Sequence, residues 1–163
     1  MTAARLRAAL VAATVTWAGL LVVTPLLASR PHASPIASAL ILAVYGIGSL
    51  VCHQLPERSY HMWTAQMPVC ARCAGIYFGA VVGAIAGWFR TATVGSRARL
   101  LAAHGLLGPR TILALAVTPT LVTLVYEWTT GDMPAHAIRA AAGVPIGGVV
   151  AWLVVAAADN QVN

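Results

Sequence analysis

The sequence predicts an all-α membrane protein, a polytopic bundle of about five transmembrane helices. Of its 163 residues, 60% are hydrophobic and only 9% are charged, and lysine is absent. A soluble domain carries about 25% charged residues. Several uncharged runs also reach the length of about 20 residues that a helix needs to cross a bilayer. These observations exclude a soluble globular protein and predict one integral membrane domain over residues 1–163, with the lipid bilayer as its main partner.

Apolar runs define the five expected helices. Their approximate limits are 8–28, 33–52, 70–89, 111–130 and 138–158. The first run follows Arg5 and Arg7, as in a signal peptide, but it is longer than the usual apolar stretch of about 7–15 residues. We therefore expect it to be retained as a helix. The fourth run is the shortest, because its uncharged part stops at Glu127.

The third expected helix is striped with glycine. Glycines occur at every fourth position, namely Gly75, Gly79, Gly83 and Gly87. The last helix has a shorter version, namely Gly143 and Gly147. This spacing places them on one helical face and is typical of close helix contact in lipid. The glycines predict that these two helices pack on each other, or that one of them packs on a membrane-protein partner or a second copy of the chain.

The positive charge is carried entirely by arginine, with a formal net charge of +6. No basic patch is interleaved with exposed aromatic residues, so we expect no nucleic-acid partner. Five crossings would place the chain start, the segment 52–73 and the turn before the last helix on one side. The arginines then divide evenly between the sides. If Arg58 and Arg72 are left out because they belong to the cysteine segment, the side with the 90–110 connection has more arginines. The positive-inside rule then favours a cytoplasmic 90–110 connection and an extracytoplasmic cysteine segment.

The short segment 52–73 holds all the cysteines, at Cys52, Cys70 and Cys73. An odd number of cysteines does not complete a disulfide framework. Three thiols with the adjacent His53 instead form a Cys3His set, which zinc uses in tetrahedral sites. The sequence therefore predicts a zinc site at the membrane interface. Because neighbouring side chains on a helix point about 100° apart, Cys52 and His53 can share an ion only if the second helix ends there.

Other residues could supply the fourth ligand. His61 lies in the same loop, and Glu127 or Asp132 could reach the site from the turn before the last helix. His61 with Met62 and Met67 would suit copper(I), a soft ion. A metal-ion handling protein is therefore a further hypothesis beside a structural metal site.

A metal-free redox site is the main alternative. Cys70 and Cys73 lie at the expected amino end of the third helix, where the helix dipole and Arg72 would lower a thiol pKa. Cys52 could serve as a third, exchanging thiol. This pattern would suit a thiol–disulfide or quinone-linked oxidoreductase. The sequence contains no phosphate-binding loop and no Ser/His/Asp hydrolase arrangement, and non-catalytic function is favoured.

A few charges accompany the cysteines. Glu57 and Arg58 are adjacent in the loop, and Glu127 closes an apolar helix. Ionisable groups at membrane depth are usually paired. We expect Glu127 to pair with Arg139 or Arg72 and so to fix helix packing.

Two motifs carry a family resemblance. Residues 52–59 read Cys-His-Gln-x-Pro-Glu-Arg-Ser, and residues 68–79 read Pro-Val-Cys-x-Arg-Cys-x-Gly-x-Tyr-x-Gly. With a later Arg-x3-Gly-x3-Gly beginning at Arg139, they resemble a family of small prokaryotic membrane proteins catalogued as domain of unknown function 2085. The resemblance covers about residues 40–155 and implies a prokaryotic cell membrane. Glu127 stands where such proteins tend to have aspartate. The family implies no activity, so our leading hypothesis is an accessory or structural subunit of a membrane complex.

Overall fold

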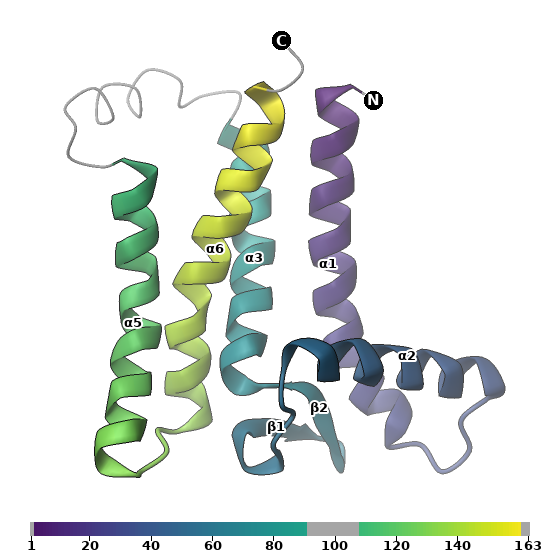
Figure 1. Cartoon of the computed structure of the whole chain (residues 1–163). Helices are drawn as coiled ribbons and strands as arrows, with labels where there is room; N and C mark the ends of the chain where they lie inside the picture. Colours follow the sequence, from purple (N-terminus) through teal and green to yellow (C-terminus); the bar gives the residue numbers. More distant parts are fainter. Residues whose placement is uncertain (1, 91–107, 161–163) are drawn as a thin grey trace.

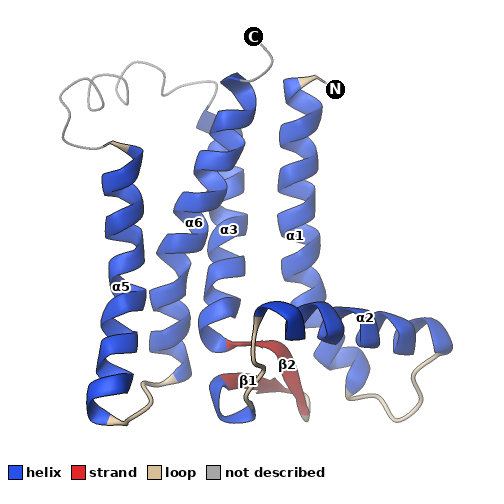
Figure 2. Ribbon diagram, in the orientation of Figure 1, coloured by secondary structure: helices blue, strands red, loops and turns tan. Residues whose placement is uncertain are grey.

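The computed structural model describes residues 2–90 and 108–160 and is mostly helical (Figure 1). Its helices are α1 (Ala3–Ala28), α2 (Pro35–Val51), α3 (Ala71–Arg90), α5 (Pro109–Thr130) and α6 (His136–Asn160). The predicted all-α class and the five helices are thus confirmed. The structure adds a small hairpin that the sequence did not predict (Figure 2). It consists of a 3-10 turn η1 (Pro56–Arg58) and antiparallel strands β1 (Ser59–Met62) and β2 (Ala65–Cys70).

Four of the helices, α1, α3, α5 and α6, are long and apolar enough to cross a membrane. They stand side by side in Figure 1, whereas α2 lies crosswise near the lower end of α1. With 17 residues, α2 is about 26 Å long, which is shorter than the apolar core of a bilayer, about 30 Å. The expected crossing at 33–52 is therefore corrected: the structure has four candidate spans, and α2 is a shorter apolar helix packed crosswise.

Losing one crossing changes which parts share an end of the bundle. The start of α1 and the end of α6 lie together at the top of Figure 1, opposite the hairpin. Arg5 and Arg7 are therefore remote from the cysteine segment, contrary to the expectation from five crossings. The guanidinium of Arg7 lies 5.4 Å from the ring centroid of Trp88, near the end of α3. The hairpin and the α5–α6 turn do share an end, as expected. Most of the 90–110 connection lies outside the described residues.

Helices α3 and α6 run in the same direction and touch through their backbones. A Cβ added to Gly75 would lie 1.9 Å from the carbonyl oxygen of Ala140, and one added to Gly79 would lie 2.2 Å from that of Val144. In return, a Cβ at Gly147 would lie 1.9 Å from the carbonyl oxygen of Ile76. No side chain fits at these positions, so the glycines are what allows the two helices to approach. This contact fixes the frame on which the site is built.

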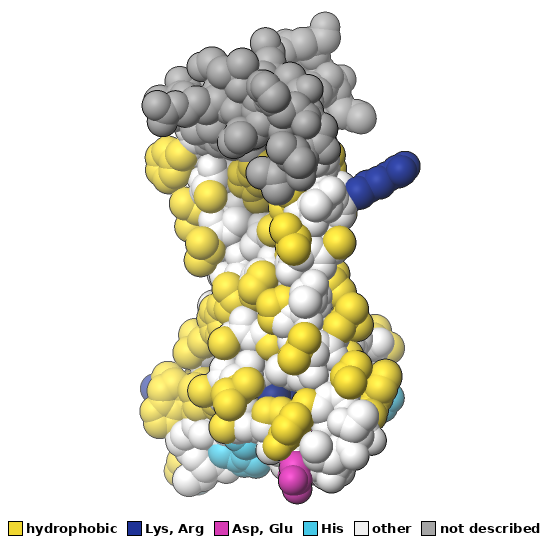
Figure 3. Space-filling model, turned by 90° about the vertical axis from the view of Figure 1, so that its left-hand side faces the viewer, with side chains coloured by type: hydrophobic (Ala, Val, Ile, Leu, Met, Phe, Trp, Pro, Cys, Tyr) yellow, Lys and Arg dark blue, Asp and Glu magenta, His cyan; other side chains and the backbone are white. Residues whose placement is uncertain are grey.

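Apolar side chains cover much of the outer surface. Figure 3 views the molecule from the α5 side: hydrophobic side chains extend along the described height, and acidic and histidine side chains gather near the lower end. A buried cluster lies where α1, α2, the hairpin and α3 meet. Its buried members are Leu21, Val44, Cys52, Met67, Val69 and Ala74. The first cysteine is thus part of the core that joins α1, α2, the hairpin and α3.

Candidate metal centre

The end of α2 sets the direction of the first cysteine. The N–H of Cys52 still donates to the carbonyl of Gly48 at 2.9 Å, but Cys52 itself has extended backbone angles, φ −146° and ψ 137°. Helix α2 therefore ends at Val51, and the chain turns into the hairpin. Gln54 follows with a positive φ of 50°. Cys52 is therefore the first residue after the helix, and its side chain is buried in the apolar cluster.

Gln54 clamps α2 against the hairpin. Its Nε2 donates to the carbonyl of Tyr45 on α2 at 2.8 Å and to the carbonyl of Pro68 on β2 at 2.7 Å. Gly48 permits the approach, because a Cβ there would lie 2.3 Å from the Pro68 oxygen. The Gln66 side chain donates in turn to the Gln54 carbonyl at 2.5 Å. Sequence reasoning missed this role, although the glutamine stands directly in the Cys-His-Gln motif.

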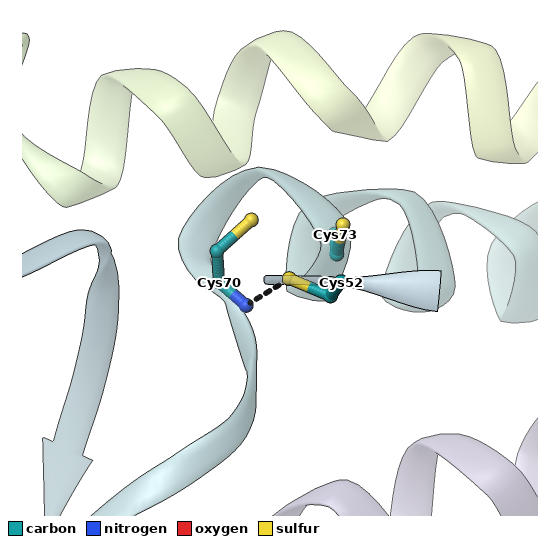
Figure 4. A group of neighbouring side chains, drawn as sticks. All are labelled: Cys52, Cys70 and Cys73. Carbon is teal, nitrogen blue, oxygen red and sulfur yellow. Dashed lines mark hydrogen bonds between the residues drawn. The ribbon is translucent and has the colours of Figure 1, made fainter. Parts of the chain in front are cut away.

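All three cysteines converge at one point (Figure 4). The sulfur atoms of Cys52, Cys70 and Cys73 all lie within 4.8 Å of one another. Cys52 follows α2, Cys70 ends β2 and Cys73 lies in the first turn of α3, and all three are free thiols. The backbone N–H of Cys70 donates to the Cys52 sulfur at 3.2 Å. This hydrogen bond ties the first cysteine to the start of α3 and helps to hold the sulfurs together.

The two nearby histidines do not join this group. His53 is exposed, although it is adjacent to Cys52. The reason is the extended backbone at Cys52, because successive side chains of an extended chain point to opposite faces. His61 lies in β1 and is also exposed. Of the predicted Cys3His set, the structure brings together the three sulfurs, and His53 stays at the surface. Asp132, an alternative fourth ligand, is exposed as well.

Glu127 is surrounded by arginines from three other elements. Its Oε1 lies 2.6 Å from Nη2 of Arg72 and 3.1 Å from Nε of Arg139, and its Oε2 lies 3.9 Å from Nη1 of Arg58. Arg72 also donates from Nη2 to Thr123 Oγ1 at 3.2 Å, one turn before Glu127 on α5. We call these four charged residues, Arg58, Arg72, Arg139 and Glu127, the arginine–glutamate cluster. It joins the hairpin region, α3, α5 and α6.

The arginine–glutamate cluster has an excess of positive charge. One carboxylate faces three guanidiniums, which leaves a formal charge of +2. Arg139 is 1% exposed. The Nε atoms of Arg58, Arg72 and Arg139 are buried without a hydrogen-bond partner among the described residues. For Arg139, Nε is close enough to Glu127 for an ion pair but lacks the direction of a hydrogen bond, so we treat that contact as electrostatic.

The α5–α6 turn closes on the hairpin beside this cluster. Nε2 of His136 lies 3.1 Å from the carbonyl oxygen of Glu57, and the His136 ring lies 5.5 Å from that of Tyr60. The side chain of Glu57 is exposed and is not part of the cluster. Two loops far apart in the sequence are therefore in contact.

The Cys70 thiol, at the end of β2, is more acidic than an ordinary thiol. Hydrogen bonding from the Cys73 side chain is the largest reason that the pKa of the Cys70 thiol falls to about 5. Hydrogen bonds from the Cys73 backbone and the Cys52 side chain, and the positive charge of Arg139, lower this pKa further, against the effect of burial. A site of this kind can bind a metal through thiolates or attack a disulfide.

Comparison with known proteins identifies the family. Residues 52–153 match the model of a family described as predicted membrane protein, DUF2085. The matched region is more than half of the chain and begins at the first cysteine. The chain belongs to this family. The family resemblance seen in the two sequence motifs is thus confirmed, and the matched region contains both the cysteines and the arginine–glutamate cluster.

Two curated relatives match shorter segments. An uncharacterized protein from Methanocaldococcus jannaschii is 50% identical over 44 residues, which are 27% of this chain and 28% of that protein. An uncharacterized protein from Methanothermobacter thermautotrophicus is 50% identical over 30 residues, which are 18% of this chain and 27% of that protein. The matches thus span just over a quarter of each relative. No solved structure matches the chain.

Proposed function

We propose that this membrane protein binds one thiophilic metal ion through Cys52, Cys70 and Cys73. The observation that supports this most is the convergence of three free thiols, from three separate elements, within 4.8 Å. Zinc and copper(I) are the common ions that select such sulfur sites. Zinc is the ion that the Cys3His pattern predicts.

The dimensions of the cluster suit a metal. Sulfur ligands about 2.3 Å from one zinc ion in a tetrahedral site lie about 3.8 Å from one another. The three sulfurs are therefore close to binding distances, and small side-chain rotations would suffice. The Cys70 N–H bond to the Cys52 sulfur also holds that sulfur beside Cys70.

Three cysteines leave a tetrahedral ion with one open position. His53 is the predicted fourth ligand, and it would have to rotate inward from its exposed position. His53→Ala tests this role: a protein ligand lost from a four-coordinate site weakens zinc binding, whereas water or an external ligand in the fourth position leaves the affinity unchanged.

A metal at this place would act as a structural tie. It would link the end of α2, the end of β2 and the start of α3, which the Gln54 clamp already brings together. Metal binding to such a site contributes directly to folding. We therefore propose a structural site in an accessory subunit of a prokaryotic membrane complex, at the membrane interface.

Elemental analysis of the detergent-purified protein, with a count of reactive thiols before and after a chelator, tests this function. We expect about one zinc or copper per chain and thiols that become reactive only after chelation. Cys52→Ser should lose the metal, while Ser49→Ala, an exposed change in the last turn of α2, should keep it. Three thiols that react freely without a chelator, and no bound metal, would sink the proposal.

A thiol oxidoreductase is the second candidate, and the low pKa of Cys70 favours it. The Cys70 thiolate would attack a partner's disulfide and form a mixed disulfide, with one partner sulfur leaving as a thiolate. Cys73 would then attack Cys70, closing the Cys70–Cys73 disulfide and releasing the reduced partner. Cys73→Ser should trap the mixed disulfide. If the wild-type protein is purified with bound metal and Cys73→Ser traps no mixed disulfide, the oxidoreductase function is excluded.

A further inference from the structure

The buried charge beside the cysteines calls for a balancing charge. Arg139 is almost fully enclosed, and with Arg72 and Arg58 it shares one carboxylate, Glu127. A buried charge that is not paired is costly in a medium of low dielectric constant. The buried part of the arginine–glutamate cluster, Arg72 and Arg139 with Glu127, carries +1, while the side chain of Arg58 is 39% exposed and its charge is screened by water. The folded protein therefore gains from negative charge placed next to this cluster.

The remaining acidic side chains do not provide this charge. Glu57 and Asp132, the other acids at this end of the bundle, are both exposed to solvent. Asp159 lies at the opposite end of α6. The thiols are groups beside the cluster that become negative when they bind a metal, since Arg72 stands between Cys70 and Cys73 in the sequence. Arg139 is also held next to the start of α3, because the carbonyl oxygen of its neighbour Ala140 would lie 1.9 Å from a Cβ at Gly75, two residues after Cys73.

The total charge of a metal–thiolate centre depends on the ion. Three thiolates around a divalent ion such as zinc carry −1, and around a monovalent ion such as copper(I) they carry −2. Of the two centres, the copper(I) centre is the more negative and therefore gains more from a neighbouring positive cluster. The number of ligands points the same way, since the grouped metal-binding side chains among the described residues are three cysteines. Copper(I), unlike four-coordinate zinc, can be satisfied by three sulfurs, and thiolates suit a soft ion.

We propose that the arginine–glutamate cluster is the counter-charge of a three-thiolate copper(I) centre and favours this monovalent ion over zinc. The inference rests on the proposed metal centre and names its ion. Arg139 and Arg72 act here through the thiolates and are charge-balancing residues that do not touch the metal.

The test compares affinities for the two ions in charge variants. Copper(I) is offered anaerobically against a chromophoric copper(I) chelator, and zinc(II) against a zinc chelator, and the ratio of the two affinities is taken for each protein. The ratio compares two complexes of the same variant, so the protonation of the empty site and a partial loss of folded protein both cancel. One unit of buried charge at roughly 10 Å shifts such a ratio on the order of tenfold.

The variants predict changes of opposite sign. Arg139→Gln removes one positive charge and should lower the preference for copper(I) about tenfold, whereas Glu127→Gln adds one and should raise it by a similar factor. Arg139→Lys keeps the charge and should keep the ratio. Arg110→Gln, an exposed change at the other end of α5, is the matched control and should have no effect. If the arginine–glutamate cluster only fixed helix packing, these ratios would stay at the wild-type value.

The outcomes separate this inference from the proposed function. Ratios that move in opposite directions in Arg139→Gln and Glu127→Gln support the charge-balancing role. Wild-type protein that binds one metal per chain, but with ratios unchanged or shifted the same way in both variants, keeps the metal centre and overturns the inference. Wild-type protein that binds neither ion overturns both.

Discussion

Arg72 on α3 donates from Nη2 to Glu127 Oε1 on α5 at 2.6 Å, directly beside the cysteine centre. The same Nη2 also donates to Thr123, so one guanidinium group contacts two successive turns of α5. Because Arg72 lies between Cys70 and Cys73, a single short sequence both supplies the thiols and anchors α5. The stability of the bundle and the geometry of the centre are therefore linked at this residue.

Loss of that anchor should loosen α5. Arg72→Gln removes a buried, charged hydrogen bond to Glu127, which costs about 2 kcal/mol. We expect a lower midpoint of thermal unfolding in detergent, measured by circular dichroism on metal-free protein so that metal binding does not contribute. Arg110→Gln, on the exposed start of α5, serves as the control and should unfold as wild type does. Equal midpoints for Arg72→Gln and wild type would show that the contact adds nothing to stability.

The α3–α6 contact should tolerate no added methyl group. In Gly79→Ala the new Cβ would meet the Val144 carbonyl oxygen at 2.2 Å, so the helices must separate. We expect a loss of about 1–3 kcal/mol, as for overpacked cores. Gly19→Ala is the matched control, because nothing lies within 4 Å of a Cβ at Gly19 on α1. There, alanine should be neutral or stabilise by up to about 1 kcal/mol, since glycine is the poorer helix former.

The free energy of unfolding of both variants can be measured by titration with a denaturing detergent. A Gly79→Ala protein as stable as Gly19→Ala would mean that α3 and α6 do not touch at this point. The comparison separates the packing effect from the general difference in helix propensity between glycine and alanine.

Residue patterns were sufficient to predict the helices and the convergence of the cysteines. Apolar runs without charge predict helices in lipid, and the Cys-x-x-Cys spacing places two thiols at a helix start. The glycine spacing also indicated a contact between the third and last helices. These are local or periodic signals, and tertiary packing left them unchanged.

The course of α2 was not predictable in this way. A run of about 20 apolar residues reads the same whether the helix crosses the bilayer or lies along its surface. What decides it here is the tie made by Gln54 and Gly48 to the Pro68 carbonyl, a contact between distant residues. The position of His53 depends on the same detail, because the chain becomes extended at Cys52 and turns the next side chain outward.

The acidity of Cys70 should appear in its reactivity. Because its pKa lies at about 5, the metal-free, reduced protein should hold Cys70 as a thiolate at pH 6–7, where an ordinary thiol is mostly protonated. Alkylation of Cys70, located by mass spectrometry, should therefore rise through pH 5 and be nearly constant above it. Cys73→Ala removes the largest cause of the shift and should move the rise towards pH 8. A wild-type Cys70 that reacts only above pH 8 contradicts the assignment.

Four crossings make a prediction about sidedness that five would not. The start of α1 and the end of α6 should face the same compartment, with the cysteines in the other. Among the described residues, one side receives four arginines, namely Arg5, Arg7, Arg90 and Arg110. The cysteine side receives four, namely Arg30, Arg58, Arg72 and Arg139. Two of those four, Arg72 and Arg139, are buried against Glu127 and are not available to set the orientation.

From the positive-inside rule we predict that the two helix ends face the cytoplasm and that the cysteines lie outside. When intact cells are treated with a chelator, a membrane-impermeant maleimide should label the cysteines. Cys70→Ser should reduce that labelling. Reporter tags joined before α1 and after α6 should both be protected from external protease until the cells are opened. Protection of one tag and cleavage of the other would require an odd number of crossings, and α2 would then have to span the membrane rather than lie across the bundle.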